Sequence, residues 1–419
     1  MSPAATGQNA AGPNAVYFDK RFQNPQINET EFSLQQQLGH RTALTLSYMG
    51  SYAHELPQFL DRNIDLNAAA TLFYNLEDPG SPGNLGPLGK SGTRGSASSI
   101  PYYAINRFYY QRLNPAYGSI TDIISETNAA YHAAVVRLTH RTTRGFSINA
   151  GYTYSHAIDD NQNESTFADN NDVYDPADLG LERGTSNFDV RQRVAGGIVA
   201  HEPWRLRGFA GNMLNGFTLA AAGEWRTGLP YTMRTTGSIP TPSCSYYDWL
   251  VAGGPNGGPN CLKAVSQPNG VITDEQVPIP GLGASLNGSG GEDLVAPVGR
   301  NTFRYPVAAN LDLRFAKSTR LSERVSLELV GEAFNLLNHQ NITAIQTVGY
   351  RLTNDPAHAN TATLSYQSGL TTTTTTSASG NSIEQVVPSA TAAFGGVTNA
   401  NSSSLYHQRQ VQVGCKLVF

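Results

Sequence analysis

Nine segments of this chain alternate apolar and polar side chains with a period of two residues, and this pattern constrains the fold most. The segments span residues 28–38, 42–52, 131–140, 146–156, 188–201, 216–227, 307–317, 324–336 and 406–419. In the segment 146–156, Phe146, Ile148, Ala150, Tyr152 and Tyr154 share one face, and small or polar residues occupy the other. Strict alternation indicates β-strands with one apolar face. The sequence therefore predicts an all-β protein.

The connections between these segments alternate in length. Short connections at residues 39–41, 141–145, 202–215 and 318–323 alternate with long ones at residues 53–128, 158–187, 229–305 and 338–404. Long irregular connections are uncommon in compact soluble domains. Short turns that alternate with long outer loops are the rule in barrels that cross an outer membrane. We therefore expect an antiparallel up-and-down transmembrane β-barrel with long outer loops.

Composition excludes two other classes of protein. No apolar run approaches the roughly 18 residues of a membrane-spanning helix, so hydropathy argues against a helical membrane protein. The net charge of −4 gives no bulk attraction to nucleic acid. We therefore expect no nucleic-acid partner.

Charged side chains on the polar faces distinguish the barrel hypothesis from the alternative of a β-sandwich. They are Arg137, Arg191, Arg193, Glu224, Arg226, Asp312, Arg314, Glu328 and Glu332. In a sandwich core each would cost several kcal/mol unless it were paired. A wet lumen or a polar plug accommodates them, so their positions favour the barrel.

Aromatic residues gather at the two ends of the predicted strands. Those where strands meet long loops are Tyr48, Tyr52, Tyr152, Tyr154, Trp225, Tyr231 and Phe334, and those near short turns or the terminus are Phe146, Phe217, Phe315 and Phe419. Two such belts fit the interfacial girdles of a membrane barrel.

The last strand ends the chain on an aromatic residue, Phe419. This ending resembles that of outer-membrane proteins of diderm bacteria, in which it is read by the barrel-assembly machinery. The resemblance makes Phe419 the expected barrel-assembly terminus.

Three stretches resemble one receptor family. Residues 146–160 (FSINAGYTYSHAIDD), 179–193 (LGLERGTSNFDVRQR) and 327–342 (LELVGEAFNLLNHQNI) are similar to the C-terminal barrel of Oar-like TonB-dependent outer-membrane receptors of the carboxypeptidase-regulatory-like type. The resemblance runs from about residue 32 to residue 419. It implies a location in the outer membrane, contact with outer-membrane lipid and the barrel-assembly machinery, and a role in substrate binding and uptake.

Members of that family carry a regulatory-like domain, a plug that contacts TonB, and a larger barrel. Nine antiparallel strands do not close simply, because the first and last would run parallel. The amino terminus also lacks a basic region followed by an apolar core. We therefore expect residues 1–26 to be a loop or an incomplete start, and residues 27–419 to be the C-terminal part of a larger barrel. The plug and regulatory-like domains would be absent, so the TonB complex would be reached only through the missing plug, and this chain alone would not transport.

Two other functions stay open from the sequence. One is a structural or adhesive surface protein of the outer membrane, and the other is a secreted β-sandwich that binds carbohydrate. No G-x-S-x-G, H-E-x-x-H or C-x-x-C motif, phosphate-binding loop or dinucleotide fingerprint occurs. We therefore expect no enzyme and no cofactor. A siderophore, an oligosaccharide and a peptide are all compatible ligands for Gly-rich, aromatic loops.

Two further sites are candidates on side-chain chemistry. Cys244 and Cys261 lie in one long loop and would form a disulfide worth roughly 3 kcal/mol in an oxidising exterior, the alternative being two unrelated thiols. The acidic loop that begins at Asp159 offers oxygen ligands for Ca²⁺, although it lacks the EF-hand spacing and a solvated loop is the alternative. Its candidate ligands are Asp159, Asp160, Glu164, Asp169 and Asp172.

Overall fold

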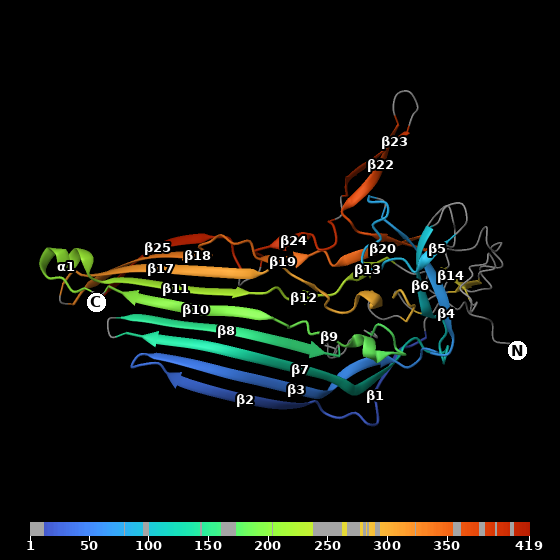
Figure 1. Cartoon of the computed structure of the whole chain (residues 1–419), viewed down its shortest axis with the longest axis horizontal. Coiled ribbons are helices and arrows are strands. Elements are labelled where there is room, and N and C mark those ends of the chain that lie inside the picture. The colour runs from blue at the N-terminus through green and yellow to red at the C-terminus, as the bar shows by residue number, and fades with distance from the viewer. Residues whose placement is uncertain are drawn as a thin grey trace.

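The computed structural model describes residues 12–78, 80–94, 100–142, 145–160, 173–202, 204–237, 262–265, 277–279, 282, 285–289, 294–322, 324–354, 362–376, 382–389, 392–402 and 406–419. Nine strands form one antiparallel sheet in which each strand pairs with the next along this series (Figure 1). They are β2 (Gln26–Gln37), β3 (Thr42–Asp61), β7 (Ile120–Arg141), β8 (Phe146–Asp159), β10 (Gln192–His201), β11 (Phe217–Arg226), β17 (Ala308–Arg320), β18 (Ser326–Phe334) and β25 (Gln410–Val418).

The nine predicted segments are these nine strands. The differences lie at their ends: β3 and β7 continue well beyond the predicted bounds, over 20 and 22 residues. The segment 188–201 becomes a strand only from Gln192, because Asp189 and Arg191 are held in an ion-pair cluster. The stretch 1–26, expected as a loop, contains β1 (Ala15–Phe18), which pairs in parallel with β7. A two-residue strand, β9 (Gly184–Thr185), pairs with the end of β8.

The register places apolar side chains on one face of the sheet and polar side chains on the other. One row of the apolar face runs from β3 to β11 through Leu46, Val136, Tyr152, Val194 and Trp225. The neighbouring row of the polar face runs through Thr45, Arg137, Gly151, Ala195 and Glu224. The side chains of the apolar row are each 37–44% exposed, since no other part of the described chain covers them. A face of this kind needs an apolar environment.

Aromatic residues at the turn end, where the short connections lie, form the expected belt. The rings of Phe217 and Phe315 stack on the apolar face with centroids 5.3 Å apart. Two predicted belt residues of the loop end lie elsewhere. Phe334 pairs with Gln410 and therefore points to the polar face. Tyr231 packs against Phe303 and other aromatic rings of the loops.

The sheet is open at both edges within the described residues, since β2 and β25 each have one unpaired side. Because the series contains an odd number of antiparallel strands, nine including both edges, β2 and β25 run in the same direction (Figure 1). The two edges therefore cannot join by the antiparallel pairing used elsewhere in the sheet.

The turn end carries a short helix, α1 (Gly208–Leu214), in the connection from β10 to β11. No helix in the described residues is long and apolar enough to cross a membrane.

The long connections gather at the other end, the loop end, and contain strands of their own. We call these elements the cap. An eight-stranded sheet contains β4 (Ala69–Glu77), β5 (Gly92–Arg94), β6 (Ile100–Tyr109), β13 (Arg234–Thr236), β14 (Leu262–Val265), β15 (Val277–Ile279), β20 (Val348–Asn354) and β21 (Ala362–Tyr366). Three ribbons pair β12 (Pro230–Tyr231) with β16 (Phe303–Arg304), β19 (Ile342–Ile345) with β24 (Val397–Ala400), and β22 (Leu370–Thr376) with β23 (Ser382–Pro388). Within the described residues the cap also contains two 3-10 helices, η1 (Leu179–Glu182) and η3 (Ala296–Val298).

The largest buried cluster of the described residues lies in this cap and not in the nine-stranded sheet. Its members come from three long connections and are Tyr74, Leu76, Phe108, Met233, Leu286, Val295, Tyr350, Leu352 and Leu364. The cap is thus a packed unit, whereas the sheet leaves its apolar face to the surroundings.

The two faces of β7 generate a test of the membrane interpretation. Val136 lies on the apolar face and its neighbour Val135 on the polar face. We expect Val136→Lys to destabilise the chain folded in lipid bilayers by about 2–4 kcal/mol, because a lysine in hydrocarbon is poorly solvated. Val135→Lys, the matched control, should cost far less. Denaturant titration in bilayers measures both, and equal losses would contradict the assignment of the faces.

Candidate functional site

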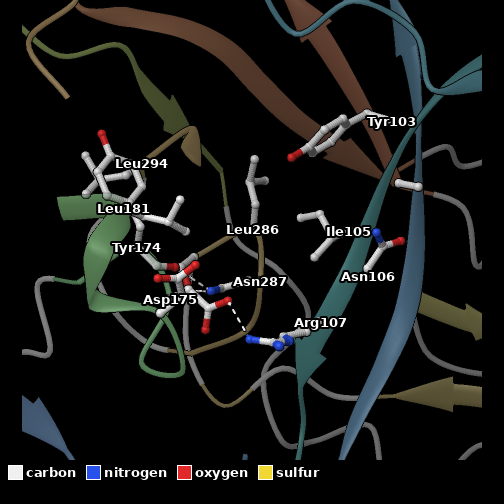
Figure 2. A pocket seen from close by; sticks show the side chains of 13 residues that line it. Tyr103, Ile105, Asn106, Arg107, Tyr174, Asp175, Leu181, Leu286, Asn287 and Leu294 are labelled. Atoms are coloured by element: carbon white, nitrogen blue, oxygen red, sulfur yellow. Dashed lines mark hydrogen bonds and ion pairs between the residues drawn. The ribbon is translucent and has the colours of Figure 1, made fainter. Parts of the chain in front are cut away.

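A cavity of about 370 Å³ opens in the cap, between β6 and two loop segments (Figure 2). Strand β6 provides Tyr103, Ile105 and Arg107. The other walls are the segment 174–181, from the connection between β8 and β10, and the segment 285–294, from the connection between β11 and β17. The cavity therefore exists only when three long connections fold together.

Strand β6 aims alternate residues at the cavity because of its two-residue period. Tyr103 and Arg107 point toward it in Figure 2. Arg107 lies 3.8 Å from the Asp175 carboxylate on the facing segment. Tyr109, at the end of β6, is fully buried and donates its hydroxyl to the same carboxylate at 2.6 Å. These two contacts fix Asp175 at the cavity wall.

The second wall is set by Asp178, which caps the helix η1. Its carboxylate accepts a hydrogen bond from the Gly180 amide at 3.2 Å. Leu181 of the same helix turns its apolar side chain to the cavity (Figure 2). The wall thus presents two carboxylates beside an aliphatic surface.

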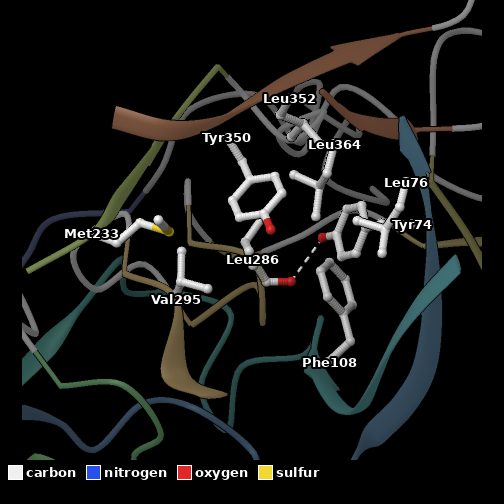
Figure 3. Packing of buried hydrophobic residues seen from close by; sticks show 9 residues of the cluster. All are labelled: Tyr74, Leu76, Phe108, Met233, Leu286, Val295, Tyr350, Leu352 and Leu364. Atoms are coloured by element: carbon white, nitrogen blue, oxygen red, sulfur yellow. Dashed lines mark hydrogen bonds between the residues drawn. The ribbon is translucent and has the colours of Figure 1, made fainter. Parts of the chain in front are cut away.

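The third wall is a tight turn at residues 285–289. The side-chain amide of Asn287 donates to the Tyr174 carbonyl at 2.5 Å, and the backbone carbonyl of Asn287 accepts a hydrogen bond from the Tyr109 amide at 2.7 Å. Gly288 has φ +74°, and a Cβ there would lie 2.4 Å from the Tyr109 carbonyl oxygen, so a glycine is required. The turn is held to the cap core by Tyr74, whose hydroxyl donates to the Leu286 carbonyl at 2.7 Å (Figure 3).

The phenols of Tyr103 and Tyr109 have raised pKa values, which keeps them protonated at neutral pH. Burial raises the pKa of Tyr103 to about 12. Burial, and then the hydrogen bond to Asp175, also raise the pKa of Tyr109. A cavity with phenol and guanidinium donors, carboxylate acceptors and an aliphatic wall can hold a partly polar molecule in one orientation.

Two ion pairs join the cap to the end of β8 and to the segment just before β10. Arg300 pairs with Asp159 at the end of β8, and the side chains are 5% and 6% exposed. Arg304 pairs with Asp189, whose side chain is fully buried. Burial raises the pKa of Asp189, but hydrogen bonds from the Ala157 amide and the Arg304 guanidinium outweigh it and hold the pKa below the usual aspartate range.

The polar face carries charged side chains, as the sequence predicted, and several of them form ion pairs between neighbouring strands. Arg193 of β10 lies 3.0 Å from Glu224 of β11. Arg314 of β17 lies 3.2 Å from Glu328 and 3.3 Å from Glu332, both on β18. This face is therefore suited to water or to a polar partner.

The predicted calcium ligands are only partly within the described residues. Asp159 is paired with Arg300, and Asp160 lies 2.9 Å from Arg183. The other three candidates, Glu164, Asp169 and Asp172, lie outside the described residues. In the part of the chain that is described, no group of three or more His, Cys, Asp or Glu residues is placed to hold a metal ion. The calcium site stays a prediction.

Phe419, another residue singled out from the sequence, does not line the cavity, and neither does Cys415. Cys244 and Cys261 lie outside the described residues, so their disulfide also stays a prediction. Cys415 is free and exposed on the apolar face, opposite Leu329. Phe419 follows β25 at the turn end and is 90% exposed.

Sequence reasoning missed the cavity residues because it treated residues 53–128 as a loop. The stretch IPYYAINRFY, which forms β6, is rich in aromatic and β-branched residues and carried a strand signal. No local sequence pattern indicated that Asn287 or Asp175 would lie opposite β6 across the cavity.

Comparison with known proteins identifies a family for this chain. Residues 1–412 match the family described as outer membrane beta barrel domain. A comparison with curated protein sequences finds no significant match. Among solved structures, the outer membrane transporter YddB from Escherichia coli is similar with a TM-score of 0.37 and 10% identity, over 85% of this chain and 33% of that one.

Two further solved structures are similar at the same level. The FrpB iron transporter from Neisseria meningitidis (F3-3 variant) has a TM-score of 0.32 and 8% identity, over 78% of this chain and 29% of that one. The copper transporter OprC has a TM-score of 0.29 and 8% identity, over 83% of this chain and 30% of that one. This chain spans about a third of the length of YddB.

The buried pair Arg300–Asp159 gives a prediction for stability. We expect Arg300→Met to lower the free energy of unfolding by about 3–5 kcal/mol, because it leaves the Asp159 carboxylate buried without its cation. Arg183→Met, the control, removes a surface pair whose arginine is 60% exposed and should cost less than about 1 kcal/mol. Denaturant titration in detergent measures both, and a loss of the same size in the control would count against the role of the buried pair.

Proposed function

This chain belongs to the outer membrane beta barrel domain family and lies in the outer membrane, and on this premise we propose that it is the C-terminal part of a TonB-dependent receptor. In this proposal the cap binds a ligand outside the cell and the strands provide part of the wall through which the ligand is taken up. The cavity bounded by Tyr103, Arg107, Asp175 and Asn287 is the ligand site. No catalytic step is involved.

The position of the cavity carries this proposal. Three long connections build it at the loop end of the sheet (Figure 1). On the same sheet, one face is apolar and the other carries the ion pairs of Arg193 and Arg314. A site on the outside, joined to strands with a water-compatible face, is the arrangement that uptake across an outer membrane requires.

The open edges support the view that the barrel continues beyond this chain. Unpaired backbone groups in hydrocarbon cost several kcal/mol each, so spanning sheets close. Because β2 and β25 run in the same direction, an all-antiparallel barrel needs an odd number of additional strands. In the proposed receptor these are the earlier barrel strands, and the TonB complex acts through a plug. A transcript that starts at Met1 with no barrel sequence upstream would contradict this part of the proposal.

One observation favours adhesion as the second candidate function. The β22–β23 hairpin projects from the rest of the cap (Figure 1). Val386 of this hairpin is 54% exposed and Leu370 is 41% exposed. A projecting hairpin with exposed apolar residues can contact a matrix or another cell.

The cavity predicts how a ligand binds. A panel of ferric siderophores, oligosaccharides and peptides is titrated against the chain, with binding followed by calorimetry. We expect Arg107→Gln and Asn287→Ala each to weaken the bound member of the panel by about 10-fold or more, since each removes a hydrogen-bonding group at the cavity. Arg351→Gln, which changes an exposed arginine of β20 outside the cavity, is the matched control and should bind normally. Equal binding by all variants would place the ligand elsewhere.

Uptake and adhesion predict different phenotypes for a deletion strain. Uptake predicts that the strain loses growth on the bound ligand and keeps attachment to surfaces. Removal of residues 370–388, the β22–β23 hairpin, should then leave growth on the ligand unchanged. Loss of attachment with normal growth would favour the adhesive function.

A further inference from the structure

The connection from β10 to β11 builds a compact projection at the turn end, away from the cavity. Glu202 accepts the Gly216 amide at 2.8 Å and closes its neck. Asn215 accepts the Leu206 amide at 3.0 Å and donates to the Leu206 carbonyl at 2.8 Å. Trp204 donates its indole N–H to the Leu214 carbonyl at 2.9 Å. These bonds hold residues 204–214, which we call the α1 projection, in one conformation.

The α1 projection exposes large apolar side chains. Phe209 is 81% exposed, Met213 58%, Leu214 48% and Trp204 46%. Burying side chains of this size contributes roughly 1.5–3 kcal/mol each. An ordered segment that holds four of them in water carries a cost that a partner would remove.

Two arginines alternate with these apolar residues. Arg205 and Arg207 are exposed, and within the described part of the chain neither has an ion-pair partner. Arg320, at the end of β17, and Arg324, in the connection to β18, line a hollow that Arg205 and the neck residue Glu202 also border. The projection is therefore apolar and cationic at once, and its charge fits an anionic surface.

The projection lies next to the aromatic belt at the turn end, where the apolar face of the sheet ends. Phe217 and Phe315 form the aromatic belt of the turn end, directly after the projection in sequence and on the paired strand. Lys317 places its ammonium group 4.9 Å from the Phe217 ring centre and bonds the Asn215 carbonyl. An aromatic pair with a lysine reaching past it marks a membrane–water interface.

From these observations we propose that the α1 projection is a docking site for anionic phospholipid in the leaflet on the turn side. Trp204, Phe209, Met213 and Leu214 enter the interfacial layer, and Arg205 and Arg207 bind headgroup phosphates. This inference goes beyond ligand uptake and does not depend on it. It assigns the projection a role in fixing the depth of the sheet in the membrane.

A lipid surface fits the projection better than an acidic soluble protein does. The exposed apolar residues precede Phe217 by a few residues in the chain, and Phe217 stacks with Phe315 on the apolar face of the sheet. Tryptophan with arginine is the combination that anchors segments at anionic interfaces. A soluble partner is an outcome of the test below.

The test makes Trp204 the lone tryptophan in the full chain, by Trp225→Phe and Trp249→Phe, and excites it selectively at wavelengths that tyrosine does not absorb. The protein is reconstituted in bilayers of phosphatidylcholine and phosphatidylglycerol, with one lipid brominated at a time. Quenching of Trp204 gives the relative binding constant of the two lipids. Circular dichroism checks the β-structure, and Trp225→Tyr replaces Trp225→Phe if the latter disturbs folding.

We expect brominated lipid to quench Trp204, with a preference for phosphatidylglycerol of at least roughly fivefold, the equivalent of about 1 kcal/mol for one arginine near an anionic surface. R205Q/R207Q should abolish the preference. R41Q/R141Q, which removes the same charge from the β2–β3 turn and from the end of β7, should keep it. Absence of quenching by either lipid would mean that Trp204 faces water or a soluble partner, and would overturn the proposal. Equal quenching by both lipids, or a preference that survives R205Q/R207Q, would overturn it as well.

Discussion

The hydrogen-bond requirement of a backbone in hydrocarbon determines the structure of this chain. Water is absent there, so each amide must pair with a neighbouring strand. The antiparallel ladder from β2 to β25 meets that requirement everywhere except at its two edges. The ladder also forces alternate side chains onto opposite faces, so one face meets lipid and the other is free to carry charge.

The hydrogen-bonded sheet and the buried apolar core consequently lie in different parts of the protein. In a soluble protein the central sheet would contain the hydrophobic core. Here the core built around Tyr74, Phe108 and Tyr350 lies in the cap, where water surrounds the protein and apolar burial drives folding. The ion pairs of Arg300 and Arg304 connect this core to the strand ends.

The sequence could predict the sheet because its signal is local. The faces of β8 and β25, and the charges Arg193 and Glu224, follow from a two-residue period that a single segment displays. The cap strands are short, and several pair across distant connections: β4 pairs with β14 and, in parallel, with β21. Nothing near Thr363 in the sequence specifies Asn75 as its partner. Asp175 and Asn287 line the same cavity because two distant connections pack together, and no local sequence pattern indicates that packing.

The two long strands have a consequence for cooperativity. β3 and β7 stay paired from the turn end to the loop end, apart from an irregularity near Glu55, and their far ends supply Leu60 and Ile124 to a small buried cluster. The cap is therefore not a module that can be cut away at a linker. Excision of residues 62–119 would expose Asp61 and Asp122, which are buried in the intact chain. The pairing of β3 with β7 would then be lost first at the loop end, and the loss would extend toward the part of these strands that lies in the bilayer. Cap and sheet should accordingly melt as one unit.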